Sequence, residues 1–328
     1  MTTYKRPTRF TSRIIRAAGD RIAQRTGGRR LCILSYHRVL DSLDPILVSE
    51  PDARTFRWQM ELLADCFNVL PLHNAVLALA TDDVPPRAVC ITFDDGYRSV
   101  HDTALPILKE LNLPATVFVT TGCMSDENMW NDRIIEAVRQ LPNGQLDMRS
   151  LGLDLGIHTL GSLEDRNQIA HYLIEKSKYL APLSRLELTK KVESMAGDLP
   201  THNLMLTREM LHELVRHDIE IGGHTISHPI LKSVNDDDAQ HEIAGNKKHL
   251  ESITGKPVRL FAYPNGKPNL DFDEHHVQMV KQAGYTAAFT TATGAATKKH
   301  DRYQLPRSRP WDSTPLMYGA RLLRWLQG

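Results

Sequence analysis

Two adjacent carboxylates, Asp94 and Asp95, end an apolar run and precede a glycine in TFDDGY of residues 92–97. Residues 87–93 (RAVCITF) are expected to form a buried strand, and side chains on a strand alternate between its faces. The two aspartates therefore point in different directions, so that one can bind a metal while the other accepts a proton. A surface turn is the alternative interpretation, because Asp and Gly dominate turns for conformational reasons.

A second motif, HTISHP of residues 224–229, places His224 and His228 four residues apart. Such a pair can share a metal, although it can also arise by coincidence in a chain with 15 histidines. The pair follows a strand-like run, as the aspartates do, and active sites of parallel α/β barrels lie at the carboxyl ends of strands. Asp95, His224 and His228 would form a two-histidine, one-carboxylate set suited to catalytic zinc or a similar divalent ion.

Two further strand ends carry candidate residues. Residues 259–266 (RLFAYPNG) run into a Pro/Gly loop in which Tyr263 and Pro264 are candidate substrate contacts, with a plain strand and turn as the alternative. His37 closes the first expected strand and would face the same end of a barrel. A single histidine in such a place is more often structural than functional.

Short apolar, β-branched runs alternate with helical segments, which is typical of a mainly parallel α/β domain. The expected strands are residues 31–36, 67–70, 88–93, 115–120, 219–222, 258–263 and 287–290. The expected helices are residues 53–66, 99–111, 208–217, 236–254 and 272–283. Seven strands suit a barrel better than an open sheet. The predicted fold is therefore α/β, a distorted (β/α) barrel with about seven parallel strands.

The predicted organisation has three parts: a basic N-terminal helix (1–30), a catalytic domain (31–310) and a C-terminal helix (311–328). Between about residues 123 and 206 the alternation gives way to helices and a hairpin-like stretch, which indicates an insertion. A region this long inside a compact domain usually serves as a lid or a substrate platform.

Charge is concentrated at the N-terminus. The chain of 328 residues has a net charge of +1, but residues 1–30 hold nine Lys/Arg and one Asp, which leaves −7 for the remainder. A mildly acidic body argues against nucleic acid as a partner. The segment 9–25 is predicted to be an imperfectly amphipathic helix, with Phe10, Ile14, Ala18 and Ile22 at four-residue spacing. Such a helix either docks on the body or contacts an anionic membrane surface.

We expect a cytoplasmic protein, with peripheral contact at the inner membrane face as the alternative. No run of 7 to 15 uninterrupted apolar residues follows the basic residues as in a secretory signal, and no stretch approaches 18 apolar residues. The four widely spaced cysteines are interpreted as reduced core residues, which fits a reducing compartment.

The motifs TFDDGY, HTISHP and FAYPNG, in this order and each after a strand, resemble those of polysaccharide deacetylases of carbohydrate esterase family four. The resemblance covers roughly residues 31–310. It implies Asp94 as the catalytic base and Asp95 with the two histidines as metal ligands. It also implies that the backbone amide of Tyr97 helps to hold the oxyanion. The implied cofactor is one divalent metal ion, with zinc favoured and cobalt, nickel, manganese or iron as alternatives.

The chain departs from the family pattern in two places. Most members carry the general-acid histidine in a late Leu-x-x-x-His motif, whereas residues 305–309 (LPRSR) contain none. The early YHRV resembles the circularly permuted branch that includes poly-N-acetylglucosamine deacetylases, which implies His37 as the general acid. In the third motif the family's arginine stands closer to Pro-Tyr-Gly, which leaves open whether Arg259 orients the base.

The implied function is metal-dependent hydrolysis of acetyl groups from N-acetylated sugars of a polysaccharide, oligosaccharide or lipid-linked glycan. Within the insertion, Trp130 could stack on a sugar ring and Asp132 could bind hydroxyls, although a tryptophan is at least as often a core anchor. Alternatives are an O-acetyl esterase or amidase on the same scaffold, or a catalytically silent sugar-binding relative.

Overall fold

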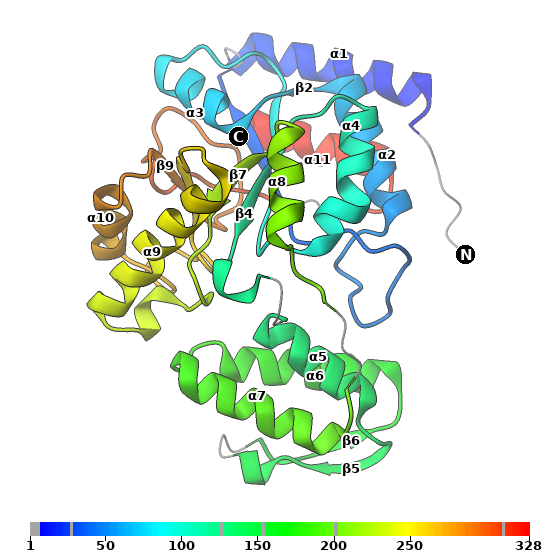
Figure 1. The fold of residues 1–328 in the computed structure, drawn as a ribbon. Helices are drawn as coiled ribbons and strands as arrows, with labels where there is room; N and C mark the ends of the chain where they lie inside the picture. Colours follow the sequence, from blue (N-terminus) through cyan, green and yellow to red (C-terminus); the bar gives the residue numbers. More distant parts are fainter. Residues whose placement is uncertain (1–6, 27–28, 125–127, 152–154, 200–202, 310–311) are drawn as a thin grey trace.

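The computed structural model describes residues 7–26, 29–124, 128–151, 155–199, 203–309 and 312–328 (Figure 1). Its central sheet has seven strands, all paired in parallel, and β2 lies beside β3. The strands are β1 (Leu31–Tyr36), β2 (Asn68–Val69), β3 (Ala88–Phe93), β4 (Thr116–Val119), β7 (Glu220–Gly223), β8 (Leu260–Ala262) and β9 (Ala287–Phe289). The predicted distorted (β/α) barrel is confirmed, although several strands are shorter than expected.

A late segment of the chain lies between the two ends of this sheet. Leu305 forms a parallel bridge with Phe289 of β9, and Ser308 forms one with Leu34 of β1. The N–H of Ser308 donates to the carbonyl of Ile33 at 2.8 Å. Residues 305–308 thus close the gap that the seven strands leave open, and they bring the intervening side chains to the inside of the barrel.

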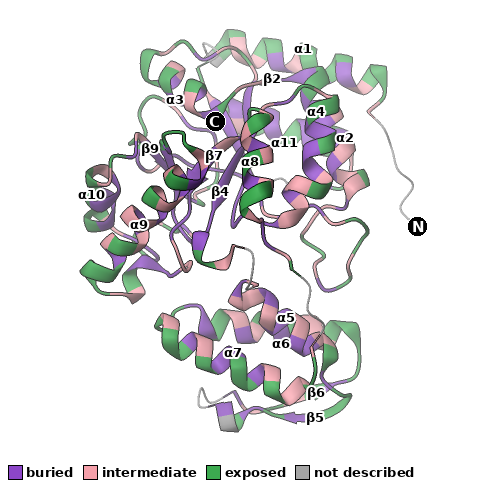
Figure 2. Ribbon diagram, in the orientation of Figure 1, coloured by how far each residue is buried: buried purple, intermediate pink, exposed green. Residues whose placement is uncertain are grey.

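Helices surround the sheet and bury its strands, which are shown as buried in Figure 2. They are α2 (Ala53–Cys66), α3 (Leu72–Thr81), α4 (Leu105–Glu110), α8 (Arg208–Arg216), α9 (Asp236–Thr254) and α10 (Glu274–Gln282). The long α9 begins where the Asn235 side chain accepts the N–H of Asp238, and it ends at Gly255 in the left-handed region. Both are standard end signals of a helix. Helix α3 was not predicted from the sequence.

The predicted insertion forms a lobe beyond the carboxyl ends of the strands (Figure 1). It contains α5 (Trp130–Gln140), α6 (Leu163–Ser177), α7 (Pro182–Ala196) and an antiparallel pair of strands, β5 (Gly144–Asp147) and β6 (Ile157–Leu160). The lobe buries its own apolar cluster, including Ile134, Val138 and Leu173. The same cluster includes Ile46, which joins the lobe to the segment after β1.

The terminal helices α1 (Arg9–Thr26) and α11 (Pro315–Gln327) pack against each other. Ile15 of α1 is buried and lies against Gly319 of α11. Phe10 and Ile14 are 73% and 44% exposed, so the predicted apolar stripe packs only in part. None of the helices in the described part of the chain is long and apolar enough to cross a membrane. The four cysteines are free thiols.

Candidate active site

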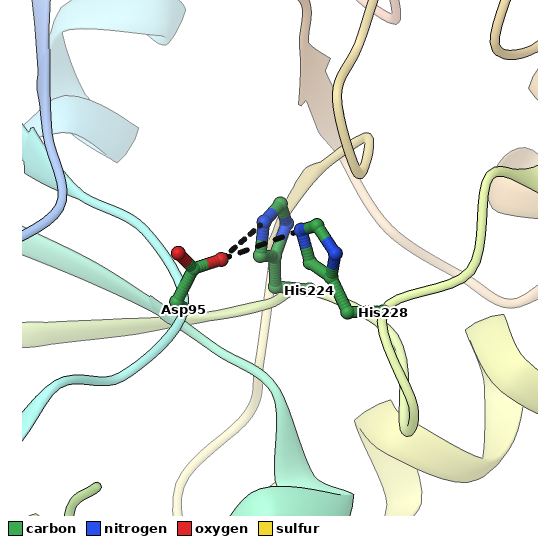
Figure 3. Close-up of side chains that lie close together, drawn as sticks. All are labelled: Asp95, His224 and His228. Atoms are coloured by element: carbon green, nitrogen blue, oxygen red, sulfur yellow. Dashed lines mark ion pairs between the residues drawn. The ribbon is translucent and has the colours of Figure 1, made fainter. Parts of the chain in front are cut away.

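Asp95, His224 and His228 meet at the carboxyl ends of β3 and β7 (Figure 3). The Asp95 Oδ1 atom lies 3.3 Å from Nε2 of each histidine. Their three ligand atoms lie within 4.8 Å of one another. Asp95 and His224 are almost completely buried, with exposed fractions of 4% and 2%. The structure therefore brings together the set that the sequence analysis named as metal ligands.

The hydrogen bonds of this cluster suit a cation. Nδ1 of His224 lies 2.7 Å from the Ala262 carbonyl, which orients the ring with Nε2 toward Asp95. Metal-bound histidines usually use their second nitrogen in this way. The Asp95 Oδ1 atom is buried and accepts no hydrogen bond from the residues that the structure describes. Burial lowers the pKa of His228 to about 3, which keeps its imidazole in the neutral form that binds metals.

The backbone of the site is strained at three residues. Asp95, Thr225 and His228 have φ values of 71°, 64° and 53°, in the left-handed region that residues other than glycine rarely adopt. The Thr225 hydroxyl accepts the N–H of His228 at 3.1 Å, which helps to hold the loop in this shape. Strain of this kind persists where surrounding contacts enforce it, and it is common at functional sites.

Two side chains of α9 hold the histidine loop, and the sequence analysis missed both. Asn246 is completely buried, accepts the N–H of His224 at 3.1 Å and donates to the Val119 carbonyl at 3.0 Å. Glu242 accepts the N–H groups of Ile226 and Ser227 at 2.7 and 2.8 Å. The one sequence signal for Asn246 was a polar residue on an otherwise apolar helix stripe, where it must find buried partners.

Asp94 forms a buried ion pair with Arg307, which comes from the segment that closes the barrel. Two guanidinium nitrogens donate to the two carboxylate oxygens at 2.6 and 2.7 Å. The Ser35 hydroxyl donates to the same carboxylate at 3.3 Å. Burial alone would raise the pKa of Asp94, but the charge and hydrogen bonds of Arg307 outweigh it and lower the pKa below its usual value. Asp94 is therefore ionised at neutral pH.

Arg259, which the sequence analysis left open as the residue that orients the base, lies elsewhere. It is exposed and directly precedes β8, at the end of the strand opposite the site. Arg307 occupies the place beside Asp94. The signal for it was the segment 305–309, which was noted for lacking a histidine and carries two arginines instead.

The metal-ligand cluster opens into a cavity of about 700 Å³ that Asp94, His37, Tyr97 and Tyr263 also line. His37 Nδ1 is buried and has no hydrogen-bond partner in the described part of the chain. Two backbone hydrogen bonds lie on either side of Tyr97. The N–H of Arg98 donates to the Leu204 carbonyl, and the N–H of Leu206 donates to the Gly96 carbonyl. The N–H of Tyr97 takes part in neither bond.

The third motif contributes less than expected. Tyr263 reaches the cavity, but its ring is 1% exposed, stacks on Phe272 at 3.8 Å and donates its hydroxyl to the Tyr303 carbonyl at 3.1 Å. Pro264 is buried and does not line the cavity. Its predicted contact with substrate stays a prediction. Tyr263 forms part of the cavity wall.

In the insertion, Trp130 lines the cavity and packs under Arg185, whose Cζ lies 4.7 Å from the ring. Asp132 does not line it, because it is buried at 2% exposure and pairs with Arg38. Arg38 in turn lies over the Tyr97 ring, 4.0 Å from its centre. Asp132 thus supports Arg38 and Tyr97, and its predicted contact with sugar hydroxyls stays a prediction.

A parallel sheet with two histidines and one carboxylate at its carboxyl edge, beside a second carboxylate, has the residue types of a hydrolase site that can hold a divalent cation. The family model described as polysaccharide deacetylase matches residues 81–196 and 188–288, together more than half of the chain. The chain belongs to the polysaccharide deacetylase family. Its predicted enzyme class, a carbohydrate deacetylase acting on carbon–nitrogen bonds, is confirmed.

Several similar proteins are named as deacetylases. YxkH of Bacillus subtilis, which carries the name polysaccharide deacetylase, is 24% identical over 85% of this chain and 71% of its own length. The poly-β-1,6-N-acetyl-D-glucosamine N-deacetylase of Staphylococcus aureus is 24% identical over 68% of this chain, which spans only 54% of that protein. The structure of the deacetylase PplD of Streptococcus pyogenes, solved with acetate, is also similar. The match covers 90% of this chain and 98% of the PplD chain, with 19% identity and a TM-score of 0.59.

Proposed function

We propose that this protein is a metal-dependent deacetylase that removes acetyl groups from the N-acetylated sugars of a glycan. One arrangement carries the proposal: the Asp95, His224 and His228 cluster shares a cavity with Asp94 and its partner Arg307. This places a site for a divalent cation beside an ionised carboxylate of depressed pKa. The relative from Staphylococcus aureus, named for a poly-N-acetylglucosamine substrate, supports a substrate of the same kind.

Asp95, His224 and His228 would hold the metal, with zinc favoured by the nitrogen-rich ligand set and cobalt, nickel, manganese or iron as alternatives. When bound, the ion would polarise the acetamide carbonyl and lower the pKa of a water molecule. Asp94 takes a proton from the attacking water while the oxygen of that water forms a bond to the carbonyl carbon. The N–H of Tyr97 donates a hydrogen bond to the oxyanion that develops.

His37 completes the reaction as the proton donor. The carbon–nitrogen bond breaks as the imidazolium of His37 gives its proton to the leaving nitrogen, and the products are acetate and a free amino sugar. Its place in the cavity and its unpartnered Nδ1 support this role. Arg307 keeps Asp94 charged and fixes the orientation of its two oxygens.

The test is acetate release from N-acetylglucosamine oligomers after loading with zinc. Asp94→Asn and His37→Ala should each lower kcat by about 10²- to 10⁴-fold, the usual contribution of a general base or acid. Both variants should still bind one equivalent of metal, because neither residue is a ligand. Full activity of His37→Ala would refute its assignment. Stoichiometric metal binding without acetate release from any acetylated sugar would refute the substrate class.

We propose further that the protein works at the cytoplasmic face of a membrane, with α1 as the contact. Phe10 and Ile14 are exposed on this helix, and so are Arg9 and Arg13 beside them. Exposed apolar groups next to arginines suit an anionic lipid surface. Co-sedimentation with phosphatidylglycerol vesicles should fall strongly in a Phe10→Ser, Ile14→Ser variant. Equal binding by both proteins, or none by either, would contradict the contact.

A further inference from the structure

One face of α6 lines the cavity that contains the metal-ligand cluster. Its residues there follow one another in alternating steps of three and one, so that each has a neighbour three or four positions away and all lie in one row along the helix. They are Asn167, Ala170, His171, Ile174, Glu175 and Lys178. A row of eleven residue steps at 1.5 Å each is about 16 Å long. That length exceeds a single sugar ring, so the cavity extends well beyond the place of the reacting acetamide.

The charged groups of this row cancel each other. Lys178 donates to Glu175 at 2.6 Å, and the two are one helical turn apart. A cation paired in this way attracts a phosphate or carboxylate only weakly, because its charge is already compensated. The row therefore favours a ligand without charge of its own.

The remaining polar groups of the row are available to a ligand. Asn167 and His171 form no side-chain hydrogen bond with any residue of the described chain, and His171 is exposed. Along the row, Ala170 lies between Asn167 and His171, and Ile174 follows His171, so that apolar atoms alternate with the polar groups. An amide and an imidazole alternating with small aliphatic surfaces match the hydroxyl groups and the C–H faces of a neutral sugar.

We propose that α6 binds the sugar units next to the one that is deacetylated, so that the enzyme acts on glycan chains in preference to single acetamido sugars. This inference rests on the proposed deacetylase function. It assigns to the insertion the choice of substrate length, through Asn167 and His171. The catalytic groups of the barrel mouth act on one unit while α6 holds its neighbours.

The experiment compares kcat/KM for acetate release from N-acetylglucosamine and from its tetramer. In the unsubstituted protein the tetramer should be the better substrate. In the double variant Asn167→Ala, His171→Ala, kcat/KM for the tetramer should fall about tenfold, as expected for the loss of one or two hydrogen bonds. The value for the monosaccharide should stay within about twofold. Gln168→Ala is the matched control, because Gln168 lies on α6, bonds to Glu164 and does not line the cavity.

Each alternative outcome is distinguishable. An unchanged value for the tetramer, or an equal fall for both substrates, would overturn the role of α6 while the proposed function stands. No preference for the tetramer in the unsubstituted protein would overturn it as well. Absence of acetate release from every substrate by the unsubstituted protein would instead refute the deacetylase function, and with it the inference. Circular dichroism of the double variant checks that the lobe remains folded.

Discussion

Arg307 binds both carboxylate oxygens of Asp94, at 2.6 and 2.7 Å, and its side chain is completely buried. The two residues are 213 positions apart in the chain, and the contact exists because residues 305–308 close the barrel between β9 and β1. A fork of two parallel N–H···O bonds fixes direction as well as charge. Arg307 is therefore the positioning residue of the candidate base.

Arg307→Met should damage both stability and activity. It leaves a carboxylate buried without its cation, which costs about 3–5 kcal/mol of unfolding free energy. It also removes the main cause of the low pKa of Asp94, so that pKa should rise and the acid limb of the pH–activity profile should move to higher pH. The measurement is a set of urea melts and a pH series of kcat/KM. Arg259→Met, on an exposed arginine far from the site, is the control, and equal effects of both variants would contradict the assignment.

Glu242→Ala should weaken metal binding more than it weakens the fold. Glu242 orders the loop between the two histidine ligands through the N–H groups of Ile226 and Ser227. Loss of such outer support typically lowers metal affinity by about 10- to 100-fold. Competition titration with a zinc chelator measures the affinity. Lys248→Ala, an exposed change on the same helix, should leave the affinity as it is. An unchanged zinc affinity in Glu242→Ala would show that the loop holds its shape without this carboxylate.

Removal of metal by a chelator should abolish acetate release and lower the thermal midpoint of unfolding. A ligand present at 100 times its Kd stabilises the folded state by about 2.7 kcal/mol, and this contribution is lost in the metal-free protein. Zinc added back should restore both properties. His228→Ala should not respond to the chelator, since it lacks one of the three ligands. A chelator-treated protein of full stability and activity would rule out a metal site at this cluster.

His101 should make stability depend on pH. Its ring nitrogens lie 2.7 Å from Asp102 and 3.0 Å from Glu213. Burial by itself would lower the pKa of His101, but the two carboxylates outweigh it and raise the pKa above 6.5. A raised pKa in the folded state stabilises the fold fully below about pH 6.5, and this contribution disappears as the pH rises through the raised value.

The matching variant is His101→Gln. It should lower the unfolding free energy by about 0.5–1 kcal/mol at pH 5.5, the range for a partly exposed pair, and by much less at pH 8.5. Urea melts at the two pH values measure the difference. His212→Gln, on an exposed histidine of α8 next to Glu213, is the control. A loss for His101→Gln that is equal at both pH values would mean that packing, and not charge, is responsible.

The sequence allowed the barrel, the succession of its strands and the proximity of Asp95, His224 and His228 to be predicted, because each depends on a short local pattern. Asp95 and the pair His224 and His228 each follow a buried strand, and parallel strands end at one edge. Helix α3 was missed since it starts after Pro71 without a side-chain cap, so no start signal marks it. Its apolar residues also show little of the contrast between faces that reveals a surface helix.

The parts of the site that could not be predicted all depend on contacts between distant segments. Arg307 and Asn246 are far along the chain from Asp94 and His224, the residues that they hold. No short sequence pattern contains both members of either pair. The burial of Asp132 against Arg38 was not foreseen either, because the two residues are far apart in the chain. The side-chain type indicates what a residue could bind, but the tertiary structure decides which partner it finds.

The segment that closes the barrel also links catalytic competence to the completeness of the fold. Residues 305–308 have one bridge each to β9 and β1, whereas the central strands pair along several residues, so we expect this segment to detach at a lower free energy than the central strands unfold. Detachment would withdraw Arg307 and expose Asp94 to water. Loss of turnover should then precede the loss of sheet structure on heating. The temperature at which activity is lost would therefore report the local opening of residues 305–308, below the temperature at which the whole molecule unfolds.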